Sequence, residues 1–145
     1  MQPTDLSPRD LGFFGESLTS AAQQWRSAAK QFAAEHSLGP RGPWILGLVA
    51  RRRLTFPSDL SAILQCSKGA ITGELAKLEK AGLIDRRTGQ RDGRKVELSV
   101  TRIGNRALAR LADLLIDLVA TRLANHSRAD LLHCSQLLRD FGLRQ

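Results

Sequence analysis

The feature that most constrains this chain's fold is a pair of short helical patterns around a tight turn near residue 66. The first pattern begins at Pro57, and the second runs from about Lys68 to Ala81. Gln65 and Cys66 separate them, Ser67 is a favourable N-cap, and Gly82 occupies the usual C-terminal position. The apolar residues on the two helical faces are Leu60, Ile63, Ile71, Leu75 and Leu78. This spacing predicts two helices that pack on one core through their apolar faces.

The residues on either side extend this arrangement. Residues 83–87 are typical of a short strand, residues 88–94 form a turn-rich basic loop, and residues 95–100 alternate polar and apolar side chains. They predict a β-hairpin with a basic tip. A further short helix is expected from Pro43, with an apolar face of Trp44, Ile45, Leu48 and Val49. Helices followed by such a hairpin are the plan of a winged helix-turn-helix.

Long helices are expected on both sides of this lobe. Ser7, Pro8 and Asp10 form a capping box for a helix that should end near His36, before Gly39-Pro40. Its apolar and small residues repeat at heptad spacing: Leu11, Phe14, Leu18, Ala21, Trp25, Ala28 and Phe32. Such a stripe must pack on other helices or on a second chain.

The C-terminal part predicts two more helices. Thr101 should cap the first, which carries Leu108, Leu111, Leu115 and Leu118. Residues 125–127 break it, and Ser127 with Asp130 caps a last helix that carries Leu131, Leu138 and Phe141. The expected fold is mainly α with a small β-hairpin wing, flanked by long helices at both ends. The expected division is an N-terminal helix (1–40), a winged lobe (41–100) and C-terminal helices (101–145), intertwined as one domain.

The basic charge of the chain is concentrated in its middle. The net formal charge is +8, and residues 51–110 hold 14 basic and 6 acidic residues, whereas the remainder holds 8 of each. A localised excess indicates a surface for a polyanion, of which the phosphate backbone of DNA is the commonest. A B-form major groove, about 12 Å wide, admits one α-helix.

The helix from Lys68 is the candidate for that groove. A turn of 100° per residue places Gly69, Gly73, Ala76 and Lys80 opposite its apolar face, with Lys77 beside them. Two glycines in one short helix cost stability, so they indicate either close approach to the groove floor, close packing on another protein element, or plain tolerance of glycine. Ser67, Lys68 and Thr72 at the helix start should reach phosphates or base edges.

The predicted wing tip carries Arg91, Asp92 and Arg94. An arginine on a thin loop can enter the narrow minor groove, where negative potential is focused. Asp92 would hold Arg94 or a neighbouring arginine in place through a charge-assisted hydrogen bond. The alternative for these residues is a solvated polar turn.

Residues 38–108 resemble the MarR family of winged-helix regulators. The matching pieces are Leu38-Gly39-Pro40, Pro57-Ser58-Asp59-Leu60, Ser67-Lys68-Gly69-Ala70-Ile71-Thr72, Leu78-Glu79-Lys80-Ala81-Gly82-Leu83-Ile84, Asp92-Gly93-Arg94 and Leu98-Ser99-Val100-Thr101-Arg102-Ile103-Gly104. Their order and spacing are specific together. The sequence departs from the family at Gly73, where members commonly carry a basic residue, so direct reading of guanine at that point is in doubt.

The resemblance implies a homodimer with interlocked terminal helices. It implies recognition helices in successive major grooves of a near-palindromic operator, wings in the flanking minor grooves, and Arg94 as the minor-groove arginine with Asp92 as its partner. It also implies a repressor that a small, often aromatic, ligand releases from DNA. Four aromatic residues are candidates to line the ligand pocket, or are plain core: Phe13, Phe14, Trp25 and Trp44.

Other functions have weaker support in the sequence. A redox-responsive regulator could use Cys66, which precedes the recognition helix, or Cys134 on the last helix. A winged helix could also serve protein contacts, with affinity that does not depend on salt. The three histidines form no catalytic or metal motif, so we expect no enzyme, metal or cofactor. The absence of a long apolar run or an apolar leader predicts a cytoplasmic protein without a membrane partner.

Overall fold

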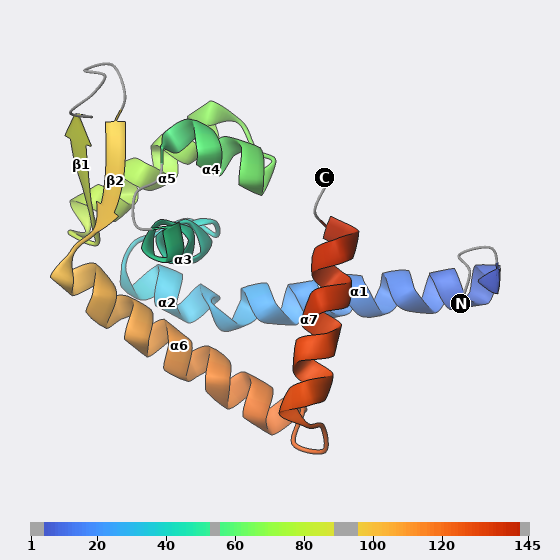
Figure 1. Ribbon diagram of the computed structural model, residues 1–145. Coiled ribbons are helices and arrows are strands. Elements are labelled where there is room, and N and C mark those ends of the chain that lie inside the picture. The colour runs from blue at the N-terminus through green and yellow to red at the C-terminus, as the bar shows by residue number, and fades with distance from the viewer. Residues whose placement is uncertain (1–4, 53–55, 89–95, 143–145) are drawn as a thin grey trace. The chain divides into compact units, whose positions relative to one another are not determined.

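The computed structural model describes residues 5–52, 56–88 and 96–142 of the chain (Figure 1). The elements in chain order are α1 (Pro8–Ala28), α2 (Lys30–Glu35), α3 (Gly42–Arg52), α4 (Pro57–Leu64), α5 (Lys68–Lys80), β1 (Ile84–Thr88), β2 (Val96–Val100), α6 (Arg102–Arg122) and α7 (Arg128–Gly142). The predicted class, mainly helical with one hairpin, is confirmed. Contacts divide the chain into two compact units, residues 1–115 and 116–145.

Helices α4 and α5 form the predicted pair around a tight turn. Gln65 ends α4 in the left-handed region with φ of 49°, and the backbone N–H of Cys66 donates to the Ser61 carbonyl. The Ser67 side chain then accepts from the Ala70 N–H at 3.1 Å, as an N-cap should. Gly82 follows α5 with φ of +73°, a conformation that glycine adopts without strain.

The hairpin lies one residue later than the sequence predicted. Strands β1 and β2 pair antiparallel, with Ile84 opposite Val100 and Thr88 opposite Val96. Leu83, expected to begin the first strand, instead donates its N–H to the Leu78 carbonyl and closes the turn after α5. Its side chain is still buried beside that of Ile84, so the alternation of buried and exposed side chains begins only at Ile84.

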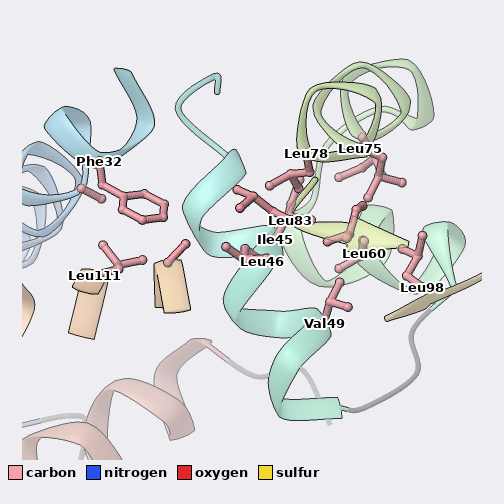
Figure 2. Close-up of a cluster of buried hydrophobic side chains, with 14 residues drawn as sticks. Phe32, Ile45, Leu46, Val49, Leu60, Leu75, Leu78, Leu83, Leu98 and Leu111 are labelled. Atoms are coloured by element: carbon pink, nitrogen blue, oxygen red, sulfur yellow. The ribbon is translucent and has the colours of Figure 1, made fainter. Parts of the chain in front are cut away.

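The core of the lobe forms around α3. Figure 2 shows α3 side chains between Phe32 and Leu111 on one side and Leu75 and Leu78 on the other. Ile45, Leu46 and Val49 are fully buried, whereas Trp44 and Leu48 are only partly buried. The sequence therefore predicted a buried face of α3 that is centred too close to Trp44. The sequence pattern missed Leu46 because α3 has apolar residues on more than one side.

The single helix expected from Pro8 to His36 is wrong, because it divides at Ala29. The Ala29 N–H donates to the Arg26 carbonyl three residues back at 3.2 Å, which tightens the turn. Ala29 and Phe32 pack into the core after the break, and the stripe from Leu11 to Trp25 contributes no buried residue. The described part of α1 therefore does not bury its own heptad stripe.

Helix α6 begins against the hairpin. The Gly104 N–H donates to Thr101 Oγ1 at 3.0 Å, which confirms Thr101 as a capping residue. Thr101 Oγ1 also donates to the Gly82 carbonyl at 2.6 Å, and the Thr101 N–H donates to the Leu83 carbonyl at 3.1 Å. A Cβ added at Gly104 would overlap the Leu83 carbonyl oxygen and lie 2.6 Å from Val100 Cγ1. Gly104 therefore permits the close packing of α6 on the hairpin.

Both predicted capping boxes at the chain ends are present. In the first, the Ser7 hydroxyl and, with a smaller effect, the Ser7 backbone N–H donate to Asp10, and these bonds lower the pKa of the Asp10 carboxyl. In the second, the backbone N–H and then the hydroxyl of Ser127 donate to Asp130 and lower its pKa in the same way. Because the carboxylates are the favoured acceptors, both caps weaken as the pH falls through these lowered pKa values.

Candidate nucleic-acid interface

Helix α5 presents an open face opposite its buried side. Ile71, Leu75 and Leu78 are buried as predicted, which fixes the direction of the other residues. The exposed residues of this helix and its cap are Ser67, Lys68, Gly69, Thr72, Gly73, Ala76, Lys77, Glu79 and Lys80. A small-residue face flanked by lysines is suited to a narrow, negatively charged partner.

The two glycines on this face have no packing role among the described residues. A Cβ added at Gly73 would meet nothing within 4 Å, and one at Gly69 would meet only Ser67 Oγ at 4.0 Å. Neither glycine has a positive φ. Close packing on another element of the described chain is therefore excluded as their reason. Approach of an external partner and simple tolerance of glycine remain.

The polar groups at the start of α5 have local partners. Ser67 Oγ is engaged as the N-cap, and Thr72 Oγ1 donates to the Lys68 carbonyl at 2.8 Å. That bond uses the hydroxyl proton and directs the oxygen lone pairs of Thr72 outward as acceptors. The Lys68 side chain begins at the helix N-terminus, where the backbone favours an anion such as phosphate.

Lys77 has an intramolecular partner that the sequence analysis missed. Its Nζ lies 3.4 Å from Oε1 of Glu74, and 52% of its side chain is exposed. Glu74 itself is buried on the apolar side of α5. Its position three residues after Ile71 places it on that side of a helical wheel, so the signal was present in the sequence. An external phosphate would therefore compete with Glu74 for the Lys77 ammonium group.

The tip of the predicted wing, with Arg91, Asp92 and Arg94, lies outside the described residues. The described strands of the hairpin carry two basic and two acidic side chains. Arg86 Nε lies 3.0 Å from Glu79 Oε2, and Arg87 is exposed on β1 opposite Glu97. The hairpin is thus joined to α5 by an ion pair across the lobe.

Two of the four predicted pocket aromatics meet. The rings of Trp25 and Trp44 stack with centroids 6.0 Å apart and an angle of 19° between their planes. They line a cavity of about 360 Å³ together with Pro43, Gly47, Leu48, Arg51, Ile63, Leu64, Leu108, Leu111, Ala112 and Leu115. Phe13 and Phe14 are exposed near the start of α1 and are not among the lining residues.

Other candidate sites gain little from the structure. Cys66 is partly buried in the turn before α5, and Cys134 is exposed on α7; both are free thiols. His36 Nδ1 lies 3.0 Å from the Phe32 carbonyl, and its ring packs on that of Phe32. Over the described ranges, no three histidine, cysteine or acidic side chains gather where a metal ion could bind. No helix in those ranges has the length and hydropathy needed to cross a membrane.

Comparisons with known proteins agree with this geometry. The family model of the MarR family matches residues 38–95. A MarR transcriptional regulator from Methanosarcina mazei Go1 superposes with a TM-score of 0.78 and 15% identity over 90% of this chain and 96% of that one. The transcriptional regulator BldR from Sulfolobus solfataricus superposes with a TM-score of 0.68 and 21% sequence identity, over 93% of this chain and 99% of that one. A cysteine-to-serine mutant of E. coli MarR complexed with operator DNA superposes with a TM-score of 0.69 and 19% sequence identity, over 88% of this chain and 91% of that one. Comparison with the curated protein sequences found no match.

The fold and the open face of α5 define a winged helix-turn-helix protein. The matched segment includes α3, α4, α5 and β1 and ends one residue before β2. Over residues 38–95 the chain matches the MarR family model, and its fold is the fold of solved MarR regulators. Two of the superposed structures are described as transcriptional regulators.

Proposed function

We propose that this chain is a homodimeric, sequence-specific repressor that binds double-stranded DNA through α5 and its wing. The observation that carries the proposal is the outward face of α5, where two glycines have open space in front of them and Ala76 is exposed. A face of small residues lets the helix backbone approach the floor of a major groove. Lys68 and Lys80 mark the two ends of that helix and are placed to meet phosphates.

The site proposed for DNA consists of the α5 face and the wing. Its residues are Ser67, Lys68, Gly69, Thr72, Gly73, Lys77, Arg91, Asp92 and Arg94. Thr72 and the groove-facing backbone would read base edges, and Lys68 and Lys77 would bind phosphate. Arg94 would enter the minor groove, with Asp92 to hold it. The excess of basic residues in positions 51–110 supports this assignment.

Selection from random duplexes at two salt concentrations tests the proposal. We expect enrichment of a near-palindromic motif, with affinity that falls steeply as salt rises because bound phosphates release counterions. Arg94→Ala should lower the affinity for that motif at least about tenfold. Glu16→Ala, an exposed change on α1, is the control. An unselective pool, or affinity independent of salt, would favour a protein-binding winged helix instead.

The proposed dimer is supported by helices that bury none of their own residues. Every described residue of α7 is exposed, including the apolar Leu131, Leu132, Leu137, Leu138 and Phe141. Helix α1 likewise exposes Leu11, Phe13, Phe14 and Trp25. Apolar stripes of this length are costly in water and are typical of surfaces that a second copy covers.

A charge on α7 should therefore dissociate the dimer. We expect Leu138→Asp to shift the protein from dimer to monomer in sedimentation at micromolar concentration, because a buried unpaired carboxylate is strongly unfavourable. Gln136→Asp changes the opposite side of the same helix and should leave the dimer intact. A wild-type protein that sediments as a monomer would contradict the proposal.

The cavity beside Trp25 and Trp44 supports regulation by a small aromatic ligand. Its volume of about 360 Å³ lies within the range of small-molecule sites. Leucine side chains supply apolar walls, and Arg51 supplies a cation. We propose that a ligand there changes how α1 and α6 support the winged lobe and so lowers operator affinity.

Intrinsic fluorescence offers a direct test, because both tryptophans of the chain line the cavity. Titration with benzoate and with phenol should change the emission to saturation and weaken operator binding in parallel. Trp44→Leu should abolish the effect on DNA, and Phe13→Leu, outside the cavity, should preserve it. Saturable quenching without any change in operator affinity would argue against an effector role.

A further inference from the structure

One polar side chain stands in the buried face of α5. Ile71, Leu75 and Leu78 are apolar, but the fourth buried residue is Glu74, with 9% of its side chain exposed. Burial of a carboxylate is costly unless hydrogen bonds and opposite charge compensate for it. An apolar residue of similar size would fill the same place without that cost, so the carboxylate needs a specific reason.

Glu74 reaches out of its own helix to the loop between α2 and α3. The Gly39 N–H donates to Oε2 at 3.0 Å, across 35 residues of sequence, and Lys77 Nζ lies 3.4 Å from Oε1. The carboxylate also lies beside Gly42, the first residue of α3, where the helix dipole favours negative charge. Both carboxylate oxygens therefore have partners.

Two glycines leave the space that the carboxylate occupies. A Cβ at Gly39 would overlap Oε1 and lie 2.6 Å from Cδ of Glu74. A Cβ at Gly42 would lie 2.8 Å from Leu38 Cβ and 3.2 Å from Oε2 of Glu74. Neither glycine has a positive φ, so backbone conformation does not require them. The loop is thus shaped to receive this side chain, and we refer to Gly39, Gly42 and the bound Glu74 carboxylate as the Glu74 seat.

The Glu74 seat supplies what the apolar face of α5 lacks, which is a directional restraint. Apolar burial is non-directional, whereas a charge-assisted hydrogen bond has a preferred distance and angle. A rotation of about 20° moves an atom at the outer radius of a helix by about 2 Å. Hydrogen bonds to base edges tolerate only about 0.5 Å. The rotation of α5 must therefore be fixed for Thr72 to read a base.

We propose that Glu74 is a positioning residue for DNA recognition, which fixes the rotation of α5 through the Glu74 seat and so aims Thr72 and Gly73 at the groove. The inference rests on the proposed DNA binding and adds a residue that does not touch DNA. It also connects α5 to α2, because the Leu38 N–H beside the seat donates to the Ala33 carbonyl at 2.8 Å.

Glu74→Met tests this role, since methionine keeps the apolar volume and removes the acceptors. We expect the variant to remain folded by circular dichroism, to lose about tenfold in affinity for the selected operator, and to keep its non-specific affinity and salt dependence. Glu74→Gln, which can still accept from Gly39, should retain most of the specificity. Glu16→Gln removes an exposed carboxylate from α1 and controls for the change in charge. An unchanged ratio of specific to non-specific affinity in Glu74→Met would overturn the proposal.

A double-mutant cycle tests the seat itself. Gly39→Ala should displace the carboxylate and reduce specificity about tenfold, and Glu74→Ala should do the same. Because both changes break one contact, the double variant should be no worse than either single variant. Additive losses would overturn the coupling. If the wild-type protein itself selects no motif, the proposed function fails. If the wild-type selects a motif that all these variants bind equally well, only the role of Glu74 fails.

Discussion

Gly73→Leu should abolish sequence-specific DNA binding while it makes the protein slightly more stable. A Cβ at Gly73 meets nothing within 4 Å, so the folded chain has room for a leucine, and leucine is favoured over glycine in a helix by about 0.8 kcal/mol. In the proposed complex the same side chain would hold α5 away from the groove floor. Loss of two or three base contacts at about 1–3 kcal/mol each corresponds to at least about thirtyfold weaker specific binding.

Thermal unfolding and operator affinity, measured on the same samples, separate the two effects. Gly73→Ala should give a smaller loss of affinity in the same direction. Gly12→Leu is the matched control, because Gly12 is also a helical glycine with nothing near an added Cβ and lies opposite the stripe of α1. It should raise stability without weakening DNA binding. Full operator affinity in Gly73→Leu would mean that the glycine is merely tolerated and that α5 does not approach the groove closely.

Gly104→Ala should give the largest loss of stability of any single methyl group added to the chain's described glycines outside the Glu74 seat. The new Cβ would overlap the Leu83 carbonyl oxygen, which already accepts the Thr101 N–H. A backbone atom held by the hairpin cannot rotate away as a side chain can. Overpacking of this kind costs about 3 kcal/mol, a large part of the roughly 5–15 kcal/mol that stabilises a domain.

Differential scanning calorimetry should show a melting temperature about 10 °C lower for this variant. Gly12→Ala, where the added Cβ has open space, should raise it slightly. A shift of less than about 2 °C in Gly104→Ala would show that α6 can move away from the hairpin at little cost. In that event the tight contact at Gly104 would not be what sets the position of α6.

Local signals were read correctly where they depend on neighbouring residues alone. Ser67, Thr101 and Ser127 cap their helices as their spacing predicted, and Gly82 takes the positive φ that ends α5. The outward direction of Gly69 and Gly73 also followed, because three buried residues on one helix fix the opposite face. These interactions span at most a few residues, and so a linear pattern contains them.

Errors arose where packing between distant segments decides. The break at Ala29 follows from burial of Ala29 and Phe32 in the core of the lobe, and no proline or glycine marks it. Leu46 was overlooked because α3 packs on more than one neighbour. The contact between Trp25 and Trp44 could not be predicted, because they lie on different helices and their contact depends on how those helices cross.

Apart from the break at Ala29, the sequence by itself determined the order of the helices, the hairpin, the basic middle region and the resemblance that the family model supports. Capping, hydrophobic period and charge are local properties, and each is legible in a single segment. Only the tertiary structure placed the Glu74 carboxylate on the Gly39 N–H, the two tryptophan rings together and Gly104 against the Leu83 carbonyl. The residues in these contacts are 35, 19 and 21 positions apart in the sequence, respectively, so only the folded backbone brings them within reach.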